Sequence, residues 1–240
     1  MNTLFLRLEG PLQAWGLRAR WGERDTADAP TKSGLMGLLG CVLGLRRGDV
    51  QLRELSNALR LGVRIDLAGK HMVDYHTTGG AKAADGEPEG LLSADGKHKR
   101  ETDLSWRHYL ADASFLAALQ GPPDLIVRLA TGLQAPVWPY FLGRKSCVPA
   151  TPIFAGLGQY DNDLRPALAD QPFTPRVLAA WERPGRPAAL RLLLESVPGM
   201  GNRQYDNLGT PAQRVFRPRF VREEWLPLGD AAPLINTLEG

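Results

Sequence analysis

The sequence has few of the features that mark membrane, secreted and metal-binding proteins. It contains two cysteines in 240 residues, Cys41 and Cys147, which are too few for a disulfide scaffold or a four-cysteine zinc site. It has no apolar run near the ~20 residues that a membrane-spanning helix needs. Met1 leads into a strand-like segment rather than into a secretory signal. These absences favour a reducing, cytoplasmic location.

The charge is nearly balanced and gives little indication of the partner. Lys and Arg number 29 against 26 Asp and Glu, which gives a net charge of +3 and a pI near 9.0. With 43% hydrophobic and 23% charged residues, the chain is typical of a globular protein and is neither a coiled coil nor a disordered chain. The small positive excess permits an anionic partner without requiring one.

The order of the predicted elements indicates an α+β fold with a ferredoxin-like domain. Residues 1–149 are expected to contain strands at 3–8, 63–67, 106–119 and 137–141, and helices after Pro30, at 51–61 and at 122–133. Strands and helices in this order are typical of the ferredoxin-like fold, which RNA-recognition modules share.

Two regions lack such regular patterns. Residues from about 68 to 106 have no helical or strand period, and so long an irregular stretch inside a domain predicts a functional loop or a protruding β-hairpin. Residues 150–240 are expected to form a small β-rich region with strands at 189–195 and 214–222. Pro218 either confines the second of these strands to a sheet edge or breaks it.

The helix after Pro30 is unusually rich in glycine. Its glycines recur at spacings of three, three and four: Gly34, Gly37, Gly40 and Gly44. Each glycine costs a helix interior up to ~1 kcal/mol. The repetition therefore predicts a face of the helix along which another backbone packs closely.

Candidates for catalysis or metal binding are few. The histidines lie inside or beside the irregular insertion: His71, His76, His98 and His108. His71 and His76 are five residues apart with no cysteine nearby, which disfavours a metal site. The sequence has no Gly-x-Ser-x-Gly motif. Cys41 lies in the apolar helix, and although two preceding cations could lower the pKa of Cys147, a structural role is favoured for both cysteines.

The start of the glycine-rich helix allows two interpretations. Lys32-Ser33 lacks the preceding Gly-x-x-x-x-Gly of a nucleotide-binding P-loop, which excludes ATP or GTP binding. Thr31, Lys32 and Ser33 still offer hydroxyls, a cation and free backbone amides to a single phosphate. An ordinary capped helix is the equally weighted alternative.

Three further segments combine cations with aromatic or hydroxyl groups. One suits a phosphate-binding turn, or is a solvated basic turn: Tyr140, Gly143, Arg144, Lys145 and Ser146. Another interleaves aromatic residues with arginines, which suits single-stranded nucleic acid: Gln13, Trp15, Arg18, Arg20 and Arg24. The third predicts a nucleic-acid or protein contact near the C-terminus: Arg203, Arg214, Arg217, Arg219 and Arg222.

Five segments, in this order, resemble one known family. They are residues 6–16 (LRLEGPLQAWG), 30–40 (PTKSGLMGLLG), 74–77 (DYHT), 106–115 (WRHYLADASF) and 140–147 (YFLGRKSC). They are similar to the CasD family, the fifth-class CRISPR-associated subunits of the type I-E surveillance complex, Cascade. The C-terminal third matches this family only loosely.

The resemblance implies a fold of the repeat-associated mysterious protein type, with the insertion at 68–106 forming a long β-hairpin thumb. It implies a non-catalytic subunit without cofactor or metal, which binds the 5′ handle of the CRISPR RNA (crRNA). The implied partners are the backbone subunit CasC, the large subunit CasA and, through the guide duplex, target DNA. The RNA-binding candidates are Gln13, Trp15, Arg18, Arg20, Arg24, Thr31, Lys32, Ser33, His76, Arg107, Tyr109, Tyr140, Gly143, Arg144, Lys145 and Ser146.

A rival function comes from the type I-C branch of the same superfamily. There the corresponding protein is a metal-independent endoribonuclease that processes precursor crRNA. Such cleavage needs a general base near the 2′-hydroxyl and a cation for the developing charge. His76, His108 and Lys145 are the groups available for these roles. The matched segments resemble the type I-E branch, which favours RNA binding without cleavage.

Overall fold

The largest element of the computed structural model is a seven-stranded sheet. The structure describes residues 1–17, 22–82, 88–89, 91–92, 95–98, 101–182, 185–207 and 216–228. The strands of this sheet lie in the order β10-β1-β9-β4-β11-β13-β12, and each pairing between them is antiparallel. Their bounds are β1 Thr3–Glu9, β4 Arg60–Leu67, β9 Ser114–Gln120, β10 Phe154–Gly158, β11 Ala189–Ser196, β12 Asn202–Asn207 and β13 Phe216–Pro227.

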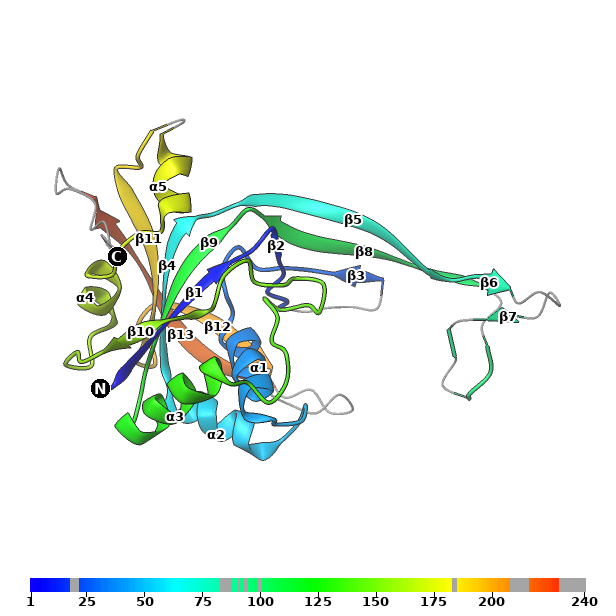
Figure 1. Cartoon of the computed structure of the whole chain (residues 1–240), viewed down its shortest axis with the longest axis horizontal. Coiled ribbons are helices and arrows are strands. Elements are labelled where there is room, and N and C mark those ends of the chain that lie inside the picture. Colours follow the sequence, from blue (N-terminus) through cyan, green and yellow to red (C-terminus); the bar gives the residue numbers. More distant parts are fainter. Residues whose placement is uncertain are drawn as a thin grey trace.

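Helices cover both faces of the sheet (Figure 1). The five helices of the described chain are α1 Lys32–Leu43, α2 Val50–Ala58, α3 Pro123–Gln134, α4 Leu164–Ala169 and α5 Pro175–Trp181. Side chains alternate across a strand, so Leu4 and Leu6 of β1 face α1 and α3, whereas Phe5 faces α4. All seven residues of β1 are buried for this reason, and the chain is confirmed as a mixed α+β protein. Among its described helices none is long and apolar enough to cross a bilayer.

The fourth predicted strand of the first half is wrong in position. Residues 137–141 form no strand, and β10, which begins at Phe154, pairs with β1 instead. The backbone amides of Val137 and Trp138 donate to the carbonyls of Val42 and Cys41, at 3.1 and 3.0 Å. Because this segment caps the last turn of α1, and because prolines on both sides lack an amide donor, it cannot join the sheet.

The glycines of α1 do not serve one close backbone contact, which corrects the prediction made from their spacing. A Cβ on Gly34 would meet the Trp15 ring at 2.8 Å, and one on Gly40 would meet Leu52 at 2.8 Å. Gly44 ends the helix with φ of 70°, as helix C-caps often do. Gly37 is exposed, and a Cβ there would have nothing within 4 Å. Each glycine therefore has a different reason, and Gly37 has no structural one.

The irregular insertion contains the predicted protruding hairpin. Strands β5 (Lys70–Gly79) and β8 (Thr102–Ala111) pair over their whole lengths and extend far from the sheet (Figure 1). Residues 106–119, predicted as one strand, are divided between β8 and β9 by a turn at Asp112, where φ is 59°. The short strand β2 (Leu12–Gln13) pairs with β8 at the base of the hairpin, and β3 (Glu23–Arg24) pairs with the middle of β8. Strands β6 (Ala81–Lys82) and β7 (Pro88–Glu89) pair with each other near the tip.

The second half of the chain continues the main sheet. Strand β11 pairs with β4, and β13 lies between β11 and β12. Pro218 pairs with Tyr205 beyond the last β11 pairing, Ser196 with Phe220, so β13 has one strand neighbour there, as expected for proline. The domain boundary at 149 remains a prediction, and β10 and β11 on its far side both pair with strands on its near side.

Candidate nucleic-acid interface

The loop that follows α3 is anchored by Arg144 to two other segments. The guanidinium of Arg144 donates to the carbonyl of His108 at 2.9 Å, and to those of Arg24 and Asp25 at 2.6 and 3.1 Å. It also lies over the ring of Tyr109, 4.6 Å from the centroid. Hydrogen bonds from a charged donor are strong. They hold the loop against β3 and β8, which gives Arg144 a structural role, and its contact with a phosphate stays a prediction.

In the rest of this loop, Gly143 packs against the backbone of Ala14, whereas Lys145 and Ser146 are exposed. Gly143 has φ of 95°, and a Cβ there would lie 1.7 Å from the carbonyl oxygen of Ala14, so only glycine fits. Tyr140 is half-buried. Burial raises the pKa of the Cys147 thiol above its ordinary value, which makes this cysteine a poor nucleophile. The exposed cation and hydroxyl are the groups open to RNA.

Gln13 and Trp15 form a buried pair and present no surface to a base. The Gln13 amide nitrogen donates to the carbonyls of Leu8 and Ala113, each at 3.0 Å, and its oxygen accepts from the Trp15 indole at 3.1 Å. Both residues are 0% exposed. The Trp15 ring packs against α1 at Gly34 and has no exposed face for a nucleotide, so contact of this residue with RNA stays a prediction. Arg18 and Arg20 lie outside the described residues.

The start of α1 matches the capped-helix alternative. The Thr31 hydroxyl oxygen accepts from the amide of Gly34 at 3.2 Å. Lys32, 3% exposed, donates to both carboxylate oxygens of Glu195 at 2.8 Å. Burial lowers the pKa of Lys32 from its ordinary value, and Glu195 opposes that effect. Glu195 already balances the charge of Lys32, which gives Lys32 a structural role. Its contact with a phosphate stays a prediction, and the half-buried Ser33 is the more accessible residue of this helix start.

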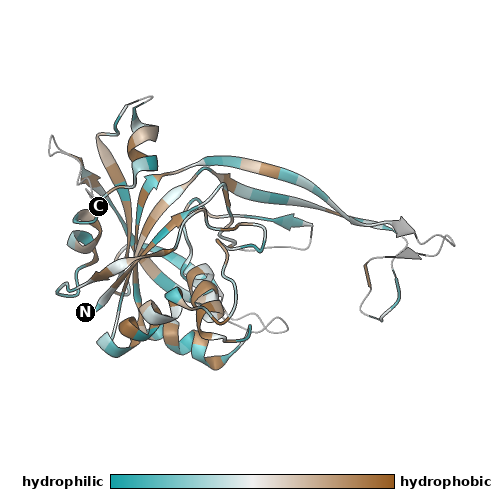
Figure 2. Cartoon of the chain, in the orientation of Figure 1, coloured by the Kyte–Doolittle hydropathy of each residue, from teal (hydrophilic) through white to brown (hydrophobic). Residues whose placement is uncertain are grey.

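The β5–β8 hairpin has one apolar and one polar face. Opposed residues share a face, and one face carries Val73, Tyr75, Leu104 and Trp106. The rings of Tyr75 and Trp106 lie 5.5 Å apart at their centroids and are 56% and 48% exposed. Figure 2 shows apolar stretches along both strands. Exposed apolar surface of this kind marks a contact site.

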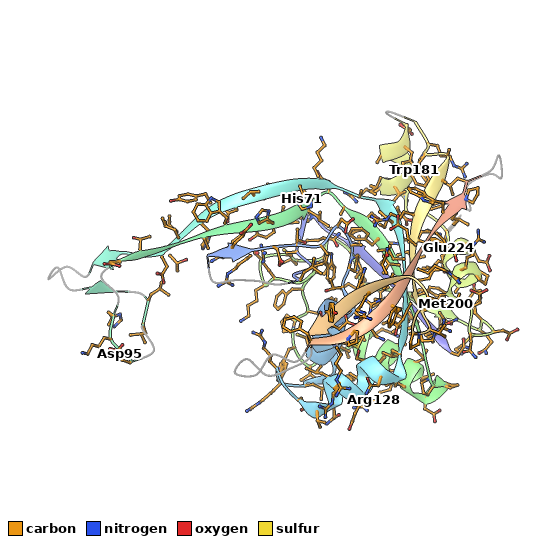
Figure 3. The ribbon with its side chains drawn as sticks, turned by 180° about the vertical axis from the view of Figure 1, so that it is seen from behind. His71, Asp95, Arg128, Trp181, Met200 and Glu224 are labelled. Atoms are coloured by element: carbon orange, nitrogen blue, oxygen red, sulfur yellow. The ribbon has the colours of Figure 1, made fainter. Side chains whose placement is uncertain are left out.

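The polar face of the hairpin carries the predicted residues His76 and Arg107, together with the buried Tyr109. Asp74 pairs with Arg107 and His76 with Ser105. The His76 Nδ1 lies 3.3 Å from a carboxylate oxygen of Asp74, and Arg107 donates to the Ser105 hydroxyl at 3.2 Å. His76 and Arg107 are half-buried. Figure 3 shows, from behind, His71 near the base of this hairpin and Asp95 near its tip.

The two histidines that a nuclease could use lie on opposite faces of the hairpin. His108 pairs with Val73 and so lies on the apolar face, opposite to His76. Its Nε2 is 3.5 Å from Glu23. In the described part of the chain no three His, Cys, Asp or Glu residues are placed to hold a metal ion.

Two of the C-terminal arginines, Arg219 and Arg222, form ion pairs. Arg219 donates to Asp206 and Gln204, at 2.8 and 3.1 Å. Arg222 pairs with Glu224 at 2.5 Å, and Arg214 lies outside the described residues. Arg203 is exposed and lies over the Phe220 ring, 5.6 Å from its centroid. Asp206 lies within the predicted segment, whereas Glu224, the partner of Arg222, follows it in β13.

Comparison with known proteins supports the resemblance seen in the sequence. A family model described as CRISPR-associated protein (Cas_Cas5) matches residues 3–225. The chain belongs to the Cas5 family. This Cas5 protein is 38% identical over 183 residues to the CRISPR system Cascade subunit CasD of Escherichia coli (strain K12). The alignment covers 71% of this chain and 78% of CasD.

Solved structures resemble the whole fold of this Cas5 protein. A chain of a structure described as a CRISPR RNA-guided surveillance complex matches with a TM-score of 0.73 and 30% identity, over 94% of this chain and 90% of that one. A crystal structure of a Cas protein matches with a TM-score of 0.64 and 35% identity, over 94% and 95% of the two chains. The likeness therefore includes the hairpin and the C-terminal strands.

Proposed function

We propose that this Cas5 protein is a non-catalytic RNA-binding subunit of a CRISPR surveillance complex of type I-E, which acts in antiviral defence by binding the 5′ handle of the crRNA. The observation that carries the proposal is its likeness, over 94% of the chain, to a chain of a complex described as RNA-guided. The 38% identity to the Cascade subunit CasD supports the same assignment.

The fold supports RNA binding by the first half of the chain. Strands β10, β1, β9 and β4 lie in the order 4-1-3-2 when numbered along the chain, with α1 after the first and α3 after the third. We interpret this as a ferredoxin-like domain, the fold of RNA-recognition modules. The boundary expected at 149 then moves to the end of β10, at Gly158.

The hairpin supports contact with neighbours in the complex. Its apolar face exposes an aromatic pair well away from the main sheet, and its polar face is the less exposed of the two. We propose that this thumb contacts the neighbouring backbone subunit, CasC, beside the guide–target duplex. The large subunit CasA is the other partner that the family resemblance implies.

The described histidines and cysteines favour binding over cleavage. His76 and His108 face opposite sides of the hairpin, and burial of Cys147 raises its pKa. A general base and a partner acid must both reach the reacting 2′-hydroxyl and the scissile phosphate. The two histidines cannot both reach one phosphate from opposite faces of the hairpin, which disfavours the rival endoribonuclease function.

RNA binding and cleavage in the absence of metal ions test the proposal. The full chain is titrated in EDTA with labelled RNA copied from its own CRISPR repeat, and with the same RNA carrying a scrambled 5′ handle. We expect at least tenfold tighter binding of the intact handle and full-length RNA after incubation. Equal binding of the two RNAs contradicts handle recognition, and site-specific cleavage that is lost in His76→Ala or His108→Ala supports the nuclease instead.

A further inference from the structure

A cavity lies between the segment before α1 and the β12–β13 hairpin. Its volume is about 790 Å³, within the range of ligand sites of roughly 300–1,000 Å³. Residues 25–31 form one wall, and Arg203 to Tyr205 with Phe216 form the other. Figure 1 shows β12 and β13 passing behind α1. Its size suits one nucleotide.

The cavity has two exposed aromatic rings on one wall. Tyr205 and Phe216 are 46% and 43% exposed. Tyr205 is opposite Pro218, two residues from Phe216, so both rings project from the same face of the paired strands. Leu193 and Pro30 add apolar surface. Flat apolar rings exposed in a cavity suit a flat aromatic ligand, because stacking needs no particular base edge.

The charges around the cavity distinguish a base from a phosphate. Among the described residues that line it, Arg203 is the one Lys or Arg, whereas Asp25 and Asp28 contribute two carboxylates. The Asp28 carboxylate is paired with Arg191 at 2.8 Å. That of Asp25 accepts from the amide of Leu17, so neither offers a donor to a phosphate placed deep in the cavity. A neutral base fits there, and a single phosphate fits beside Arg203, whose guanidinium is held over Phe220.

We propose that this cavity holds one unpaired base of the crRNA, stacked on Tyr205 and Phe216, with an adjacent phosphate at Arg203. The inference rests on the proposed function, which supplies a single-stranded RNA as the ligand. It assigns a base-binding site to the C-terminal strands, whereas the sequence placed RNA contacts mostly in the first half of the chain.

An abasic scan tests the inference with the full-length chain. A labelled RNA copied from its CRISPR repeat is compared with a series in which each 5′ handle position in turn lacks its base. One abasic position is expected to bind roughly 5- to 150-fold more weakly, the usual range for loss of one stacked base. Tyr205→Ala and Phe216→Ala lose a similar factor with intact RNA, and Tyr205→Ala loses nothing further with that abasic RNA.

Matched variants separate stacking from charge and from folding. Trp225→Ala removes a 60% exposed ring of the same strand that does not line the cavity, and should bind RNA as the wild type does. Tyr205→Phe keeps the ring and should keep the affinity. Arg203→Ala should flatten the salt dependence by about one charge, whereas Tyr205→Ala should leave it unchanged. Melting temperatures check folding, and Phe216→Ala replaces Tyr205→Ala if the latter unfolds.

The outcomes distinguish this inference from the proposed function. If the wild type binds repeat RNA tightly and both alanine variants match Trp225→Ala, the cavity holds no base while the function stands. If the wild type does not bind the RNA, the function itself fails and the inference with it. If the variants bind RNA normally but lose a partner subunit, the cavity binds protein and the inference is wrong.

Discussion

The ammonium of Lys32 lies 2.8 Å from each carboxylate oxygen of Glu195, which joins the start of α1 to β11. The side chains are 4% and 17% exposed, and Glu195 also accepts from the amide of Leu61 at 3.0 Å. This ion pair links residues 163 positions apart. It makes the C-terminal strands part of the framework that positions the first helix.

Loss of Lys32 is therefore expected to destabilise the protein. Lys32→Ala leaves the half-buried Glu195 carboxylate without its partner. Removing one member of a fully buried pair costs about 3–5 kcal/mol, and because Glu195 keeps some contact with water we expect a smaller loss in the free energy of unfolding. Urea unfolding measures this loss. The double variant Lys32→Met/Glu195→Gln should lose much less, because Gln still accepts from Leu61. A Lys32→Ala protein of native stability that binds RNA weakly would favour the phosphate role of Lys32.

The neighbouring residues Arg144 and Lys145 should behave oppositely when changed to alanine. Arg144→Ala removes three hydrogen bonds to carbonyls, and we expect the free energy of unfolding to fall by about 2 kcal/mol or more. Lys145→Ala, at an exposed site, should leave the melting temperature unchanged and reduce the salt dependence of RNA binding by about one charge. Identical melting and binding profiles for the two variants would refute this division.

Two glycines of α1 should respond differently to alanine. Gly37→Ala places a methyl group in open space on an exposed helix face, which should raise stability by about 0.5–1 kcal/mol through helix propensity. Gly34→Ala pushes against the Trp15 ring, and overpacking of this kind costs about 1–3 kcal/mol. Chemical denaturation of both variants decides, and a destabilised Gly37→Ala protein would indicate a contact on that face.

The thiol of Cys147 should react slowly in the folded protein, and its reactivity should rise at a higher pH than that of an ordinary cysteine. Burial raises the pKa of this thiol, so the reactive thiolate forms in the folded protein at higher pH than in the unfolded chain. In a Cys41→Ser background, modification by a disulfide reagent at pH 8 should be much slower in buffer than in urea. Fast modification of the folded protein, with a midpoint below that of the unfolded chain, would point to an activated cysteine.

Local patterns predicted much of the fold. The apolar run of β1, the Thr31 cap of α1 and the aperiodic stretch that contains the β5–β8 hairpin are properties of neighbouring residues, which the sequence displays directly. The position of the fourth strand depended on a competing contact, since Val137 and Trp138 cap α1. Pro139 within this segment argued against a strand, but the contact with α1 has no local signal in the sequence.

The candidate site was harder to predict than the fold. A cation or an aromatic ring in the sequence has the same appearance whether it is free or engaged by a distant residue. Lys32 forms an ion pair with Glu195, and Arg144 donates to backbone carbonyls of two other segments. The Trp15 ring packs against the helix at Gly34. Tyr205 and Phe216 carried no motif, and antiparallel pairing brings them to one face.

Sequencing the RNA bound to the protein in its host tests the central claim most directly. The tagged full-length chain is purified from cells that express the CRISPR array, and its RNA is sequenced from both ends. The account predicts crRNAs that share one repeat-derived 5′ end, with much less of this RNA bound to a variant that carries Lys145→Ala and Tyr205→Ala. A cellular RNA mixture without enrichment of crRNA would contradict it.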